Sequence, residues 1–90
     1  EQYLGLDAGI DEQSTQLMLY PNPAEDLCFF ESTLAVEEVV FYNQLGEIAL
    51  RASFNGVQSA YLDIQQLNQG VYLCHLHTKN GTIVRKLTKL

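Results

Sequence analysis

Two cysteines are the residues of this 90-residue chain whose chemistry could most affect the fold. Cys28 and Cys74 each stand in a short apolar run, and Tyr72 precedes Cys74 by two residues, as a tyrosine precedes the second cysteine of an immunoglobulin domain. A disulfide between them would stabilise the fold by ~4 kcal/mol on the chain-entropy model. Tryptophan is absent from the chain, and cysteines are often simply buried as free thiols. Both interpretations, a disulfide and two buried thiols, stay open.

Two histidines are the other candidates for chemistry. His75 and His77 alternate, so they lie on one face of a strand, but no second pair of ligands accompanies them at a spacing typical of metal sites. We therefore expect packed histidines and neither a metal nor any other cofactor. The sequence also lacks a Gly-x-Ser-x-Gly elbow, a glycine-rich phosphate loop and paired carboxylates. These absences predict that the domain is not an enzyme.

Composition and charge narrow the class of protein further. The chain is 47% hydrophobic and 18% charged with a net charge of −6, which favours one compact domain and argues against binding to nucleic acid or anionic lipid. No apolar run approaches the ~20 residues of a membrane helix, so we expect no membrane insertion. Four of the five basic residues, Lys79, Arg85, Lys86 and Lys89, lie in the last twelve positions. This cluster indicates either a solvated edge strand guarded by charge or a docking strip.

Short apolar runs closed by glycine, asparagine or proline predict an all-β fold. Residues 1–16 show no sustained period and are interpreted as a linker or frayed terminus, with the domain proper at 17–90. The spacing of the turns favours an immunoglobulin-like, seven-stranded antiparallel β-sandwich. We expect its strands at Leu17–Tyr20, Leu27–Glu31, Val39–Asn43, Glu47–Phe54, Ser59–Ile64, Val71–Thr78 and Thr82–Lys89.

Turn residues fix two of the expected breaks most firmly. Pro21 and Pro23 have no amide hydrogen for a sheet, so with Asn22 they must end the first strand. Asn80-Gly81 predicts a two-residue type I′ turn, which makes the last two strands an antiparallel hairpin.

Alternation of side chains assigns some of the faces. In the sixth expected strand Tyr72, Cys74 and Leu76 share one face. In the second strand either Leu27 and Phe29 or Cys28 and Phe30 face inward, and the sequence does not choose between these two registers.

Five segments in order resemble the type A C-terminal sorting domain of the type IX (Por) secretion system. The resemblance covers residues 16–90. It is carried by Leu19-Tyr20-Pro21-Asn22-Pro23-Ala24, Phe41-Tyr42-Asn43-Gln44-Leu45-Gly46, Leu62-Asp63-Ile64 with Leu67, Gly70-Val71-Tyr72-Leu73 and Arg85-Lys86-Leu87. A sorting signal is expected at the C-terminus, where the last of these segments stands.

The resemblance implies a function, a set of residues and a domain division: residues 1–16 would be a linker from an upstream cargo protein, and residues 17–90 the sorting domain. Such a domain directs its cargo from the periplasm through the outer-membrane translocon to the cell surface or the medium, and a surface sortase-like protease then removes it. Lys86 and Leu87, in the last strand with Arg85 and Lys89, are implied as recognition elements, together with Gly70 and Tyr72. Pro21, Asn22, Pro23 and Gly46 are implied as structural, with Gly46 supplying the positive φ of a hairpin.

A cell-surface binding or structural module of a larger secreted enzyme or adhesin is the alternative function. A carbohydrate site usually presents exposed aromatic rings, so the exposure of Tyr20, Tyr42 and Tyr61 would separate the two functions.

Overall fold

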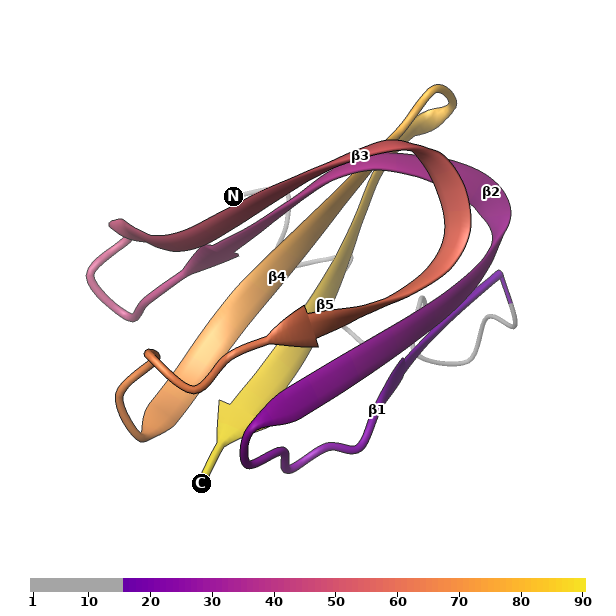
Figure 1. The fold of residues 1–90 in the computed structure, drawn as a ribbon. Coiled ribbons are helices and arrows are strands. Elements are labelled where there is room, and N and C mark those ends of the chain that lie inside the picture. The colour runs from indigo at the N-terminus through magenta and orange to yellow at the C-terminus, as the bar shows by residue number, and fades with distance from the viewer. Residues whose placement is uncertain (1–15) are drawn as a thin grey trace.

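The computed structural model describes residues 16–90, and within them the fold is all-β. Of the predicted linker, only Gln16 lies among the described residues. No helix that could cross a membrane occurs in the described part. Five strands follow one another along the chain (Figure 1): β1 (Leu17–Tyr20), β2 (Leu27–Tyr42), β3 (Ile48–Asp63), β4 (Gly70–Thr78) and β5 (Gly81–Lys89).

All five strands belong to one antiparallel sheet that curls into a half-barrel (Figure 1). Its order is β1-β2-β4-β5, with β3 also paired to β2. The first half of β2 pairs with β1 and with the end of β3, whereas its second half pairs with β4 and the start of β3. We call β1 with residues 27–31 and 59–63 the first arm, and residues 36–42 and 48–57 with β4 and β5 the second arm.

The structure has five strands where the sequence predicted seven, so the seven-stranded sandwich is not confirmed. The expected breaks at residues 34–38 and 55–56 are bends inside β2 and β3, which each run for 16 residues. The ladder register shifts on both sides of Val36, and Gly56 has a φ of 72°. Such a shift kinks and twists a strand without ending it, so signals typical of a turn mark a bend here.

The two strand breaks that the sequence predicted most firmly, at residues 21–23 and 80–81, do separate strands in the structure. β1 spans Leu17–Tyr20 and ends at Pro21, as predicted, and β4 and β5 form the antiparallel hairpin. The type I′ turn is wrong, because Thr78 pairs with Gly81 and the loop is Lys79-Asn80, with no positive φ at Asn80. The Thr78 hydroxyl stabilises this loop by accepting from the Asn80 amide and donating to the Gly81 carbonyl.

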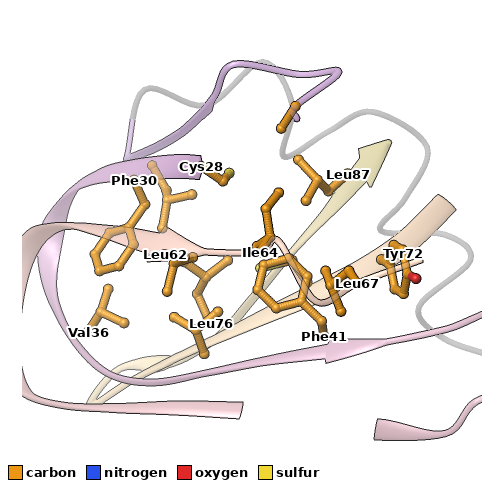
Figure 2. Close-up of a cluster of buried hydrophobic side chains, with 14 residues drawn as sticks. Cys28, Phe30, Val36, Phe41, Leu62, Ile64, Leu67, Tyr72, Leu76 and Leu87 are labelled. Carbon is orange, nitrogen blue, oxygen red and sulfur yellow. The ribbon is translucent and has the colours of Figure 1, made fainter. Parts of the chain in front are cut away.

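The core lies between the two arms and is filled from both (Figure 2). Cys28 and Phe30 are fully buried while Leu27 and Phe29 are exposed, which settles the register that the sequence left open. The predicted inward face of β4 is confirmed. The fourteen clustered side chains are Leu17, Ala24, Cys28, Phe30, Val36, Val39, Phe41, Leu62, Ile64, Leu67, Tyr72, Cys74, Leu76 and Leu87.

Candidate recognition site

The last strand, β5, alternates between buried and exposed side chains in an unusual way. Leu87 is fully buried in the core, and Arg85 and Lys89, which share its face, are each only 8% exposed. Lys86 points the opposite way and is exposed. Two of the three cations are therefore buried, so a fully solvated basic strand does not describe β5.

Arg85 spans the opening between β5 and β1. Its Nη2 donates to the Leu17 carbonyl at 3.2 Å, and its Nη1 donates to the Val84 carbonyl at 3.3 Å. No strand pairing joins β1 to β5 among the described residues. The guanidinium, with five donors in a planar fork, connects two edges that the sheet leaves unpaired.

Asn22 holds the outer edge of β5 as a strand residue would. Its side-chain amide donates to the Lys86 carbonyl at 2.8 Å, and its Oδ1 accepts from the Thr88 amide at 3.0 Å. Ala24 continues the contact, because its amide donates to the Thr88 carbonyl and its carbonyl accepts from the Leu90 amide. Pro21 and Pro23 leave this segment free of competing amides. Sequence reasoning missed the contact, since its partners lie more than 60 residues apart.

A surface hollow of about 380 Å³ lies between β1 and β5. Four residues of β1 line one side of it, and Asn22, Arg85 and Lys86 line the other. The hollow thus places the one exposed cation of β5 beside a strand edge, in a position that an incoming chain can reach.

Tyr72 and Gly70 lie at the start of β4, beside the end of β5. The buried Tyr72 donates its hydroxyl to the Asn68 carbonyl at 2.6 Å and pairs with Leu87. Gly70 pairs with Lys89 and has a φ of 152°, with open space where a Cβ would stand. A glycine is therefore favoured here by its positive φ, and not because another part of the chain packs too closely for a side chain. Gly46 has a φ of 84° in its turn, the sign predicted.

Cys28 and Cys74 are both buried and both free thiols in the structure. Burial raises the pKa of Cys28 to about 11 and that of Cys74 well above its usual value, with the neighbouring Cys28 adding to the second shift. Thiols with raised pKa values react slowly, because the thiolate is the reactive form. The disulfide between them stays a prediction.

The histidines lie on the outer face of the second arm. The His75 ring packs against Tyr42 with centroids 4.6 Å apart, and burial lowers the pKa of His75. His77 Nδ1 lies 2.9 Å from the Thr82 hydroxyl. Across residues 16–90 the structure shows no group of three or more His, Cys, Asp or Glu side chains that could hold a metal.

Comparison with known families identifies the type of domain. The model of the family described as secretion system C-terminal sorting domain matches residues 18–89, nearly the whole stretch from β1 to β5. No curated protein matches the chain.

Proposed function

Because the chain belongs to the family of C-terminal sorting domains of the type IX secretion system, we propose that the outer-membrane translocon recognises it through β5. The domain is a sorting signal of a non-catalytic family, and it implies export to the cell surface or secretion through the outer membrane. In the proposed function, residues 1–16 link the domain to a cargo protein that crosses the periplasm. A surface sortase-like protease removes the domain after translocation.

The observation that carries the proposal is the exposure of Lys86 between two buried neighbours. A partner that approaches β5 from outside meets the Lys86 ammonium at the hollow between β1 and β5, while Arg85 and Leu87 point inward. A carboxylate on the partner would complement the charge of Lys86 at close range.

The other implied residues act on the shape of β5 in this proposal. Leu87 and Tyr72 fix the strand against the core, Arg85 ties it to β1, and Lys89 Nζ donates to the Leu90 carbonyl at 3.2 Å. Gly70 supplies the backbone turn into the neighbouring strand. Substitution at these positions would disturb recognition through loss of structure, whereas substitution of Lys86 would disturb it directly.

A secretion assay tests this division. The whole chain is fused behind a periplasmic export signal and a fluorescent cargo in a host with an intact type IX system. Fluorescence is then measured in the medium, at the cell surface and in the periplasm. We expect secretion of the parent fusion with loss of the domain's mass, and retention of the Lys86→Glu variant in the periplasm. Lys79→Glu is the matched control, because Lys79 is an exposed lysine in the loop between β4 and β5.

Two results would contradict the proposal in different ways. Normal secretion of the Lys86→Glu variant would exclude Lys86 as the contact while leaving the sorting function intact. A parent fusion that stays folded and complete in the periplasm would contradict recognition by the translocon, and would favour a binding or structural module instead. Circular dichroism of each purified variant confirms that the fold is retained.

A further inference from the structure

Three aromatic rings form a row across the outer face of the first arm. Strand register aligns Tyr20 with Phe29 and Phe29 with Tyr61, so each ring comes from a different strand. Their centroids lie 5.9 and 6.2 Å apart, with interplanar angles of 33° and 55°. The rings are 39%, 39% and 62% exposed in that order. The row is therefore a continuous, solvent-facing aromatic surface that follows the twist of the sheet.

Acidic and hydroxyl groups flank the row. Glu31 lies one step along the face and accepts from the Tyr20 hydroxyl at 3.0 Å, and Asp63 follows Tyr61 on the other side. Ser59 pairs with Glu31. The face of this arm carries no lysine or arginine among the described residues, which are Met18, Tyr20, Leu27, Phe29, Glu31, Ser59, Tyr61 and Asp63.

We propose that this row binds a neutral polysaccharide, one sugar ring stacked on each aromatic ring. The apolar C–H face of a pyranose packs on an aromatic ring, and ring-to-ring spacing near 6 Å is about the length of one sugar unit in a chain. The carboxylates of Glu31 and Asp63 are acceptors for the hydroxyl groups at the edge of each sugar. The same two charges, on a chain of net charge −6, repel a phosphorylated or sulfated ligand; the one lysine near the row is Lys86, which lines the hollow at its Tyr20 end.

The size of the row argues against a protein as its occupant. The three rings, with the exposed Met18 and Leu27 on the same face, offer roughly 500 Å² of surface. A stable protein interface buries about 800 Å² on each partner and uses 20–30 residues a side. The three rings come from the strands of the first arm, and only Tyr20 also lines the hollow beside Lys86. The inference therefore does not rest on recognition of β5.

Affinity electrophoresis of the whole chain tests the proposal. Native gels contain laminarin (a β-1,3-glucan), xylan, dextran sulfate or no polysaccharide, and mobility is read against the gel without polysaccharide. We expect retardation in laminarin or xylan and none in dextran sulfate. The Tyr61→Ala variant should bind about ten-fold more weakly, since each stacked ring contributes up to about one decade of affinity. Phe29→Ala should weaken binding similarly.

Tyr42→Ala is the matched control, because it removes a ring from the outer face of the second arm. Equal weakening by Tyr42→Ala and Tyr61→Ala would overturn the proposal, as would retardation in dextran sulfate alone or no retardation of the parent chain. Sedimentation velocity adds a further test. A dimer that Tyr61→Ala converts to a monomer would make the row a self-association surface and would also overturn the proposal. Tyr61 is largely exposed, so its loss leaves the fold intact.

Discussion

Two regions of the molecule reverse the usual rule for which residue types are buried and which are exposed. They are the outer face of the first arm and the last strand of the second arm. The first arm exposes Tyr20, Phe29 and Tyr61, whereas β5 buries Arg85 and Lys89. Large aromatic residues are generally inside and cations almost never are unless they are paired. The two arms pack against each other through one face of each strand. Whether a side chain is buried therefore depends on the face to which it alternates, whatever its residue type. In the first arm we assign binding to the residues that break the rule, whereas in β5 the buried cations hold the strand and the exposed Lys86 takes the binding role.

The largest expected effect comes from a bond that ties the two arms together. Cys28 stands on the first arm and Cys74 on the second, both facing the core. We expect oxidised glutathione to convert the two thiols to a disulfide, releasing two molecules of glutathione. The bond would raise the free energy of unfolding by about 4 kcal/mol, as for closure of a loop of this length. Mass spectrometry without reductant and urea unfolding measure the change.

Cys28→Ser provides the control for that bond, since it cannot form the disulfide and its stability should not respond to the oxidant. If the parent protein keeps two free thiols after prolonged oxidation under conditions where it unfolds and refolds, the cysteines are packing residues only. No covalent cross-link then joins the arms, which are held by core packing, by the continuous strands β2 and β3 and by the bond from Arg85 to the Leu17 carbonyl.

The comparison between the arms predicts opposite results for a buried cation and an exposed ring. Arg85→Ala should lower the free energy of unfolding by about 2 kcal/mol, because it leaves the Leu17 carbonyl without its charged donor and removes a packed side-chain stem. Tyr61→Ala should change it by no more than about 0.5 kcal/mol, as is usual at exposed positions. Urea unfolding followed by circular dichroism measures both.

Arg51→Ala is the matched control for Arg85. Arg51 forms a surface ion pair with Glu38 at 3.1 Å, and such pairs contribute about 0–1 kcal/mol. Similar losses for Arg51→Ala and Arg85→Ala would mean that burial of Arg85 adds nothing, and the contrast between the two arms would fail.

A smaller effect than that of Arg85→Ala is expected at Asn22. Asn22→Ala removes two side-chain hydrogen bonds to β5 and should cost about 1 kcal/mol. Amide hydrogen exchange at Thr88 should speed up selectively, because the Thr88 amide loses its acceptor. Asn22→Asp keeps the acceptor and loses the donor to the Lys86 carbonyl. Slow exchange at Thr88 should therefore persist in Asn22→Asp, and its loss there would contradict the assigned geometry.

Local sequence signals predicted much of the fold. Prolines ended β1 at Tyr20, and alternation placed Tyr72, Cys74 and Leu76 inside. The number of strands could not be predicted, because Asn55-Gly56 is typical of a turn and only pairing with a distant segment shows that the strand continues through it. Burial decided between the two registers of Cys28 and Phe30, which are equivalent in local pattern.

The candidate sites were harder to predict than the fold. The alternation alone puts Arg85 and Lys89 on the face of Leu87, but the expectation that charges are solvated outweighed that pattern. The aromatic row depends on the register that aligns Tyr20, Phe29 and Tyr61, and register is fixed by pairing across 41 positions of the chain. The role of Asn22 depends on hydrogen bonds to Lys86 and Thr88, which are still more distant in the sequence. The sequence therefore showed which residue types were present, but it did not show which of them come into contact in the fold.

The contact of Asn22 with β5 also bears on how such a domain avoids polymerising with its own copies. An unpaired strand edge is a template on which another chain can add, and exported proteins are exposed to many identical neighbours. Asn22 and Ala24 occupy the edge groups of residues 86–90, and Arg85 occupies the Val84 carbonyl. What is left open is a stretch near Thr82, too short for a stable ladder between copies. A single asparagine between two prolines thus protects the β5 edge from the addition of another copy.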